Sequence, residues 1–237
     1  MTLEAVEIKG FVESSLIEWP GRLAAVIFLP GCNLRCRYCH ARDLVLGAAS
    51  VESIPAEKVL DYAGSSGGWI DGIVISGGEP TLYAGLAGLM RDVKSRGLDV
   101  KLDTNGTRPD VIAGLMDEGL VDAVAMDVKA PLDERYLKVA NVPVDLARVR
   151  ESIRLIMQSG IEYEFRTTVS PALLSLADVV DVAREIEGAR RYCLQPFCPH
   201  VCLDEEFERH PQCPRSYLEH AAALAKGFVG EVVIRTA

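Results

Sequence analysis

Residues 23–40 of the chain read LAAVIFLPGCNLRCRYCH. The first eight form a short apolar run, and their Val, Ile and Phe content indicates a buried strand. The next ten place Cys32, Cys36 and Cys39 at the spacing C-x3-C-x2-C. Three thiolates on one short loop can hold three irons of a cubic iron–sulfur cluster and leave the fourth iron without a local protein ligand. An open position on a metal is where chemistry takes place, so this loop is the leading candidate site.

Two plainer interpretations of the cysteine loop are a zinc site and a set of unrelated thiols. A structural zinc site closes its tetrahedron with a second C-x2-C half, which this loop lacks. Unrelated thiols do not account for a loop that follows a strand and carries an aromatic residue, Tyr38, directly before its last cysteine. We therefore favour the cluster.

Length and charge bound the class of protein. With 237 residues, the chain suits one large α/β domain and is too short for two well-built ones. We expect a single domain over residues 1–237, with an N-terminal extension at 1–22 and a final part, 190–237, that holds the last strand, a cysteine-containing loop and a C-terminal helix and strand. A net charge of −9 argues against a nucleic-acid partner, whose binding surface would be basic.

Several features predict a cytoplasmic protein without a membrane partner. The first ten residues show no signal peptide. The longest apolar run, Leu23–Pro30, is far shorter than the about 20 residues that span a bilayer. Seven cysteines without a secretory signal indicate a reducing compartment and metal or redox chemistry rather than disulfides.

The chain alternates short β-type runs with helical segments. The expected strands are 23–29, 72–76, 99–104, 123–128, 163–169 and 192–195, with a last strand at 231–235. The expected helices are 54–62, 82–96, 108–118, 144–159, 175–187 and 214–226. Six successive βα units predict an α/β fold with a parallel sheet, either open and doubly wound or an incomplete barrel.

The special residues follow the ends of these strands. Since ligands bind at the carboxyl ends of parallel strands, we expect them to converge on one rim of the sheet. They are the cysteine loop, Ser76–Pro80, Asp103–Gly106, Asp127–Lys129, Arg166 and Gln195–Phe197.

These motifs resemble the radical S-adenosylmethionine superfamily. Its signature, C-x3-C-x-Φ-C with Φ aromatic, is matched at residues 32–39, and its Gly-Gly-Glu-Pro motif at residues 77–80. The resemblance implies a partial (β/α)6 barrel of the TIM type. Within the superfamily the chain is most similar to activating enzymes of glycyl radical enzymes, in particular the anaerobic ribonucleoside-triphosphate reductase activating protein. That likeness is carried by residues 10–21, 103–106, 126–129 and 165–167.

The resemblance implies a reaction and its cofactors. Cys32, Cys36 and Cys39 would bind a 4Fe–4S cluster, and S-adenosylmethionine would chelate the fourth iron. One electron, from a flavodoxin- or ferredoxin-type donor, would cleave the sulfonium and give a 5′-deoxyadenosyl radical. That radical would take a hydrogen from the Cα of a glycine in a partner glycyl radical enzyme. The alternative is a radical enzyme acting on a small molecule or peptide, such as a carboxydeazaguanine synthase.

The same resemblance implies residues that bind S-adenosylmethionine. Tyr38 would lie near the adenine, or merely pack. Gly77 and Gly78 have no side chains, so the backbone can approach the methionine end closely. Glu79 can accept a hydrogen bond from the methionine ammonium or from the local backbone.

Two carboxylates, Asp103 and Asp127, stand at neighbouring strand ends, where bare they would repel. The resemblance implies a monovalent cation between them, and a salt bridge to Lys129 is the alternative. Lys129 and Arg166 are candidates to bind the methionine carboxylate, Arg166 also the ribose. For Arg166 the plainer interpretation is a salt bridge at the strand end.

Four further cysteines lie near the sixth strand and the loop after it. Cys198, Cys202 and Cys213 are candidate ligands of a second metal, with His200 and His210 nearby. The alternative is free thiols, with Cys193 packed in its strand as a small hydrophobic residue.

The residues leave open which glycyl radical enzyme is activated.

Overall fold

The computed structural model describes residues 7–65 and 67–235. The contacts divide the chain into two compact units. The first comprises residues 1–33, 43–104 and 110–124, and the second comprises 34–42, 105–109 and 125–237. A single domain over 1–237 stays a prediction. The start of the expected N-terminal extension, residues 1–6, and the last two residues of the chain lie outside the described residues.

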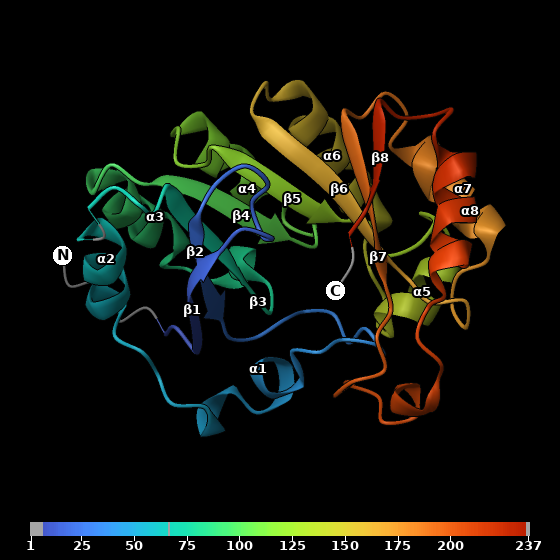
Figure 1. The fold of residues 1–237 in the computed structure, drawn as a ribbon, viewed down its shortest axis with the longest axis horizontal. Coiled ribbons are helices and arrows are strands. Elements are labelled where there is room, and N and C mark those ends of the chain that lie inside the picture. Colours follow the sequence, from blue (N-terminus) through green and yellow to red (C-terminus); the bar gives the residue numbers. More distant parts are fainter. Residues whose placement is uncertain (1–6, 66, 236–237) are drawn as a thin grey trace. The chain divides into compact units, whose positions relative to one another are not determined.

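The first unit holds a sheet whose strands follow the chain order (Figure 1). An antiparallel strand, β1, pairs with β2, and β2, β3 and β4 then pair in parallel. The strands are β1 (Gly10–Ser15), β2 (Ala24–Leu29), β3 (Gly72–Gly77) and β4 (Asp99–Thr104). The helices are α1 (Arg42–Leu46), η1 (Ala48–Ser50), α2 (Ala56–Gly64), η2 (Pro80–Leu82), α3 (Leu86–Ser95) and α4 (Pro109–Asp117).

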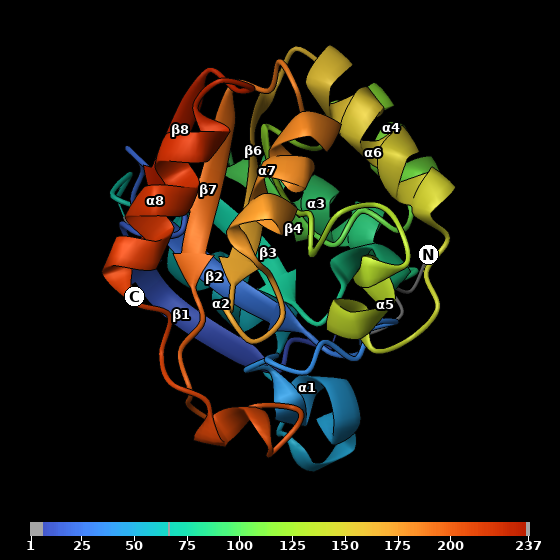
Figure 2. The ribbon, with the colours of Figure 1, turned by 90° about the vertical axis from the view of Figure 1, so that its right-hand side faces the viewer.

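In the second unit, β6, β7 and β8 are parallel neighbours, and α8 lies beside α7 and against β7 and β8 (Figure 2). Strand β5 (Ala123–Asp127) begins in the first unit and ends in the second. The other strands are β6 (Glu162–Val169), β7 (Arg191–Pro196) and β8 (Glu231–Ile234). The helices are α5 (Arg135–Ala140), α6 (Leu146–Gln158), α7 (Leu176–Glu185), η3 (Phe207–Arg209) and α8 (Arg215–Ala225).

Each predicted strand is present within one residue of its expected limits, which confirms the α/β fold with a parallel sheet. Strand β1 and the short helices α1 and α5 were not predicted, nor were the three 3-10 helices η1, η2 and η3. Strand β1 ends in the polar residues Glu13, Ser14 and Ser15, and Val12 in its middle is 42% exposed, so it lacks the apolar alternation of a buried strand. Helix α5 has only six residues, too few to show a helical period.

The core of the first unit forms around Trp19, which is fully buried. It packs with Val26 of β2 and Val74 of β3. The sheet leaves room for the ring at Gly72, where an added Cβ would stand 3.0 Å from it. Burial of so large a side chain stabilises by about 2–3 kcal/mol, so the segment before β2 is held against the sheet. Among the described residues, no helix combines the length and the apolar character needed to cross a membrane.

Candidate active site

None of the three cysteines of the loop forms a disulfide with another described residue. Cys32 belongs to the first unit, and Cys36 and Cys39 belong to the second. Cys36 is 6% exposed, while Cys32 and Cys39 are half-buried. A turn closes the end of the loop, where the N–H of Cys39 donates to the carbonyl of Cys36 at 3.0 Å. The loop therefore carries three thiol side chains within eight residues, on backbone outside helix and strand.

The loop after β3 is fixed to the residue that precedes Cys32. The N–H of Glu79 donates to the carbonyl of Gly31 at 2.7 Å, and the N–H of Gly78 donates to Leu29 at 2.9 Å. A Cβ built on Gly78 would overlap the Gly31 carbonyl. Gly77 has φ +118°, a backbone conformation that favours glycine. The two glycines are thus required by the protein's own backbone, whether or not a cofactor lies near.

The carboxylate of Glu79 is 1% exposed and accepts local hydrogen bonds. Its Oε1 receives the Thr81 N–H at 3.2 Å, the Thr81 hydroxyl at 2.5 Å and the Thr104 hydroxyl at 2.7 Å. The first of these caps the 3-10 helix η2, and the last joins the end of β3 to the end of β4. The predicted bond to the local backbone is therefore present.

Asp103 is the next-to-last residue of β4, is 6% exposed and faces the buried ammonium of Lys101. Its Oδ2 accepts from the Ser76 hydroxyl at 3.2 Å, and its Oδ1 lies 3.4 Å from Lys101 Nζ. Lys101 also donates to the Glu18 carbonyl. The sequence analysis missed Lys101. The signal was its position two residues before Asp103, which puts both side chains on one face of the strand.

In the second unit, the Asp127 carboxylate forms ion pairs with Arg166 and Lys129. Its Oδ1 accepts from Arg166 Nε at 2.9 Å, and its Oδ2 accepts from Lys129 Nζ at 2.8 Å. Burial acts to raise the pKa of Asp127, but the charges and hydrogen bonds of Arg166 and Lys129 hold it well below its usual range. Burial acts to lower the pKa of Lys129, and the Asp127 carboxylate holds it well above its ordinary value. The salt bridge to Lys129, predicted as the alternative to a cation, is thus present.

Hydrogen bonds between neighbouring strand ends fix the backbone that carries these side chains. The N–H of Val128 donates to the Arg166 carbonyl at 2.9 Å, and the Thr167 hydroxyl donates to the Val128 carbonyl at 2.7 Å. Tyr192 of β7 in turn donates to the Thr167 hydroxyl at 2.9 Å. The end of β5 is therefore tied through β6 to β7, which fixes where Lys129 and Arg166 emerge.

Two buried tyrosines lie close to Lys129. Tyr38 is 6% exposed and Tyr136 is 1% exposed, and within the described residues neither hydroxyl has a hydrogen-bond partner. Burial raises the pKa of both phenols, and the nearby Lys129 charge acts against that rise. Sequence analysis named Tyr38 but missed Tyr136. Burying these two hydroxyls near the Lys129 ammonium without hydrogen bonds lowers the stability of the fold unless a further polar group bonds to them.

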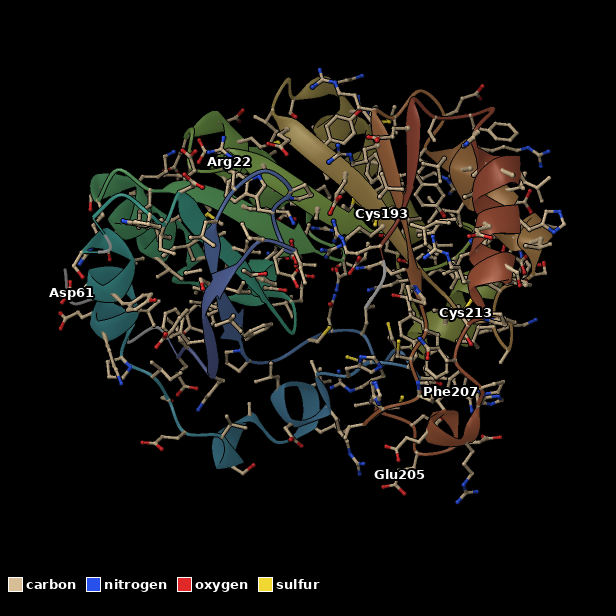
Figure 3. The ribbon with its side chains drawn as sticks, viewed as in Figure 1. Arg22, Asp61, Cys193, Glu205, Phe207 and Cys213 are labelled. Carbon is tan, nitrogen blue, oxygen red and sulfur yellow. The ribbon has the colours of Figure 1, made fainter. Side chains whose placement is uncertain are left out.

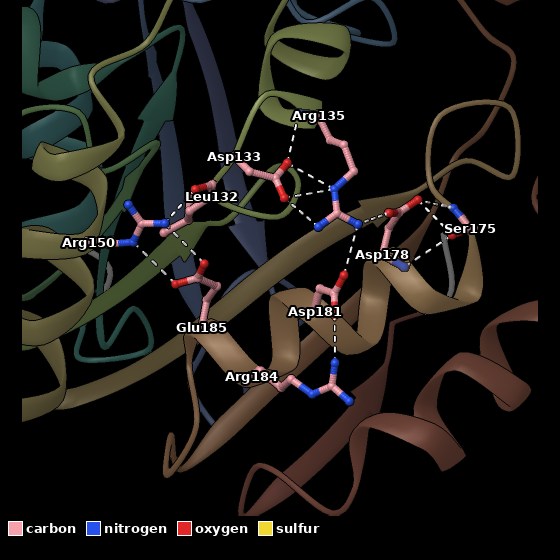
Figure 4. A network of polar contacts seen from close by, with 9 residues as sticks. All are labelled: Leu132, Asp133, Arg135, Arg150, Ser175, Asp178, Asp181, Arg184 and Glu185. Atoms are coloured by element: carbon pink, nitrogen blue, oxygen red, sulfur yellow. Dashed lines mark hydrogen bonds and ion pairs between the residues drawn. The ribbon is translucent and has the colours of Figure 1, made fainter.

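An ion-pair network fixes the helix that carries Tyr136 (Figure 4). Arg135 binds Asp133 on its own loop and reaches across to α7, where it pairs with Asp178 at 2.5 Å and Asp181 at 2.9 Å. The hydrogen bonds to these carboxylates raise the pKa of Arg135, Asp133 first among them. Asp178 also closes a capping box with Ser175. Helix α5 is thereby joined to the start of α7.

The four remaining cysteines are buried. Burial raises the pKa of Cys213 to about 11, and the nearby Cys198 adds to that rise. Burial also raises the pKa of Cys202, and the charge of Glu208 and then Cys39 add to it. No group of three His, Cys, Asp or Glu side chains in the described part of the chain is arranged to hold a metal ion. The second metal at Cys198, Cys202 and Cys213 stays a prediction, and Cys193 packs in β7 as expected.

A family model described as the radical SAM superfamily matches residues 26–191, which include the cysteine loop and the ends of β3 to β6. The chain belongs to this superfamily. Its members use a 4Fe–4S cluster and S-adenosylmethionine, and the protein is a radical S-adenosylmethionine enzyme. The spacing and thiol chemistry of Cys32, Cys36 and Cys39 fit the ligands of the cluster, and the two incompletely bonded tyrosines near Lys129 fit a polar cofactor.

Two relatives indicate the family within the superfamily to which the chain belongs. The chain is 35% identical, over 97% of its length and 95% of the relative, to a Methanocaldococcus jannaschii protein named "Putative glycyl-radical enzyme activating enzyme". It is 31% identical to the Escherichia coli pyruvate formate-lyase 1-activating enzyme, over 69% of this chain and 68% of that one. These likenesses place the radical SAM protein in the family of glycyl radical enzyme activating enzymes.

Solved structures support the fold. Streptococcus suis SuiB bound to S-adenosylmethionine matches 90% of this chain with a TM-score of 0.66 at 12% identity, and the chain spans about half of SuiB (51%). QueE from Escherichia coli matches 98% of this chain and 94% of its own, with a TM-score of 0.56 at 17% identity. At these identities the likeness concerns the fold of this radical SAM protein alone.

Proposed function

We propose that this protein activates a glycyl radical enzyme, and that its partner is an anaerobic ribonucleoside-triphosphate reductase. The observation that carries the proposal is the C-x3-C-x2-C spacing of Cys32, Cys36 and Cys39 in a chain of this family. Cys32, Cys36 and Cys39 would hold the cluster, which would supply the electron for reductive cleavage of S-adenosylmethionine and so the chemistry needed to remove a glycine Cα hydrogen. We further propose a flavodoxin- or ferredoxin-type donor and a cytoplasmic location.

The chain's own residues bind and orient the cofactor. Lys129 and Arg166, held by Asp127, present N–H donors suited to the methionine carboxylate, for which the planar Arg fork is well shaped. Tyr38 and Tyr136 offer hydroxyls in a region closed to water, so a bound polar group would satisfy them. Gly77, Gly78 and Glu79 form a rigid loop beside the start of the cysteine loop.

A monovalent cation bound by Asp103 and Asp127 remains part of the proposal. Each carboxylate already has a protein cation, Lys101 for Asp103 and Lys129 with Arg166 for Asp127, so a metal is not needed to offset either charge. The test is the affinity for S-adenosylmethionine at rising potassium concentration, for wild type and Asp103→Asn. Potassium-dependent affinity in wild type that is lost in the variant supports the cation, and affinity independent of potassium rejects it.

The activase proposal is tested with anaerobic, reconstituted protein. Mixed with candidate partners and S-adenosylmethionine under reducing conditions, it should give a glycyl radical doublet by EPR with the ribonucleotide reductase. Cys36→Ala should bind no cluster and form no 5′-deoxyadenosine. Cys193→Ala is the matched control, because this thiol is equally buried but lies in β7. Cleavage of S-adenosylmethionine without any protein radical would instead favour a small-molecule or peptide substrate.

A further inference from the structure

The segment after β7 returns to the cysteine loop. We call residues 201–210 the clasp; Phe207 and Glu205 within it are labelled in Figure 3. The clasp is part of the loop between β7 and α8, and this loop is anchored at both ends. The Phe197 N–H donates to the Val169 carbonyl at 2.9 Å, and the Cys213 N–H donates to the Phe197 carbonyl at 3.0 Å. The clasp therefore lies within a loop that is anchored at Phe197, directly after β7, and again at Cys213.

Backbone hydrogen bonds join the clasp to the cysteine loop. The N–H of Leu203 donates to the Cys39 carbonyl at 2.9 Å, and the N–H of Asp204 donates to the Arg37 carbonyl at 3.0 Å. A further bond at 2.8 Å links His40 Nε2 and the Cys198 carbonyl. Two successive amides of the clasp thus hold the stretch that contains the last two cysteines.

The side chain of Arg37 adds a second layer of contacts. Its Nε donates to Asp204 Oδ2 at 2.7 Å, and its Nη2 donates to Glu206 Oε2 at 3.1 Å. The guanidinium also stacks on the Phe207 ring, 4.8 Å from its centroid. Charge-assisted bonds and cation–π contacts are the stronger polar interactions, especially on a half-buried group such as this.

Phe207 transmits the anchorage to the sheet. It is 2% exposed and packs edge to face on Phe197, with the ring centroids 5.9 Å apart. Phe197 follows the last residue of β7. A continuous series of contacts therefore runs from β7 through two aromatic rings to Arg37, the residue directly after Cys36. Asp204, held by Arg37, has a pKa below its usual value, first because of the hydrogen bond from Arg37.

We propose that Arg37 is a positioning residue for the cluster, acting through the clasp to hold Cys36 and Cys39 in the arrangement that binds iron. This inference rests on the proposed function, in that it takes these cysteines as the cluster ligands. Without Arg37 the loop keeps its backbone bonds to the clasp but loses its link to Phe207 and two carboxylates. The loop should then open more often and release iron faster.

The experiment compares iron release from reconstituted, anaerobic holoprotein on addition of a ferrous chelator, followed by the loss of cluster absorbance. Arg37→Ala should release iron about tenfold faster than wild type. Arg215→Ala is the matched control, because it removes an exposed arginine–glutamate pair on α8 and should stay near the wild-type rate. Asp204→Asn should also release iron faster than wild type. The double variant should be no faster than Arg37→Ala, since Arg37→Ala already removes the ion pair between Arg37 and Asp204.

A second measurement separates this inference from the proposed function. In the apoprotein, amide hydrogen exchange over residues 36–42 should be faster in Arg37→Ala than in wild type and unchanged in Arg215→Ala, with equal thermal unfolding midpoints. Unchanged exchange, or iron release at the wild-type rate, overturns the positioning role. Wild-type protein that binds no cluster overturns the proposed function, whatever the exchange data show for the clasp.

Discussion

The N–H of Glu79 donates a hydrogen bond to the carbonyl oxygen of Gly31, at 2.7 Å. The loop after β3 and the start of the cysteine loop are therefore joined through their backbones. The loop after β3 cannot shift without moving the residue that precedes Cys32. Gly78 lies at the closest point of this contact, where a side chain has no room.

Gly78→Ala should destabilise the protein by about 2–3 kcal/mol, because the new methyl group would be forced against backbone rather than a flexible side chain. Urea unfolding of the apoprotein measures the loss. Gly114→Ala is the control: this exposed glycine lies inside α4 with open space around it, so alanine there should stabilise by about 0.5–1 kcal/mol. Equal effects of the two substitutions would contradict the role given to Gly78.

Asp127→Asn should destabilise the protein by about 3 kcal/mol at neutral pH, since it leaves Arg166 and Lys129 without their shared carboxylate. The pKa of Asp127 is lowered on folding from an ordinary value of 3.8. Its stabilising contribution is thus present above that pH and is lost as the pH falls through the lower, folded-state pKa. The difference in unfolding free energy between wild type and variant should shrink below about pH 4. A difference that stays constant with pH would reject the assignment.

Arg135→Ala should remove the link between α5 and α7 and cost about 1 kcal/mol, a modest value because the arginine is 32% exposed. The change should also loosen Tyr136, the next residue along α5. Thermal unfolding and amide exchange over residues 135–140 report the two effects. Arg91→Ala, which breaks an exposed pair with Glu118, is the control and should leave exchange in α5 unaltered.

The cysteines of the reduced apoprotein should react with iodoacetamide in a defined order. Cys32 and Cys39 are half-buried and should be labelled first. Cys213 should be labelled last or nearly so, because it is 4% exposed and burial raises its pKa to about 11, which leaves little thiolate at pH 8. Mass spectrometry of timed samples gives the order, and labelling in urea should abolish it. Early labelling of Cys213 would contradict its placement.

Local pattern was enough to predict the sheet and the strand ends. Apolar runs marked each buried strand, and Asp103, Asp127 and Arg166 were identified because they follow or end such runs. Lys101 was missed although its position two residues before Asp103 placed both side chains on one face of the strand. Tyr136 was missed because a six-residue helix is too short to show a helical period. Contacts of Arg37 were beyond local pattern, because its partners lie 167 and 169 residues further along the chain.

That separation has a consequence for the order in which the protein is made. The cysteine loop is synthesised first, and Asp204, Glu206 and Phe207, which support it, follow at least 167 residues after Arg37. A nascent chain would expose its cysteines without this support. Stable insertion of iron should therefore follow synthesis of residues 204–207, and truncation before residue 204 should leave a protein that takes up the metal but does not retain it.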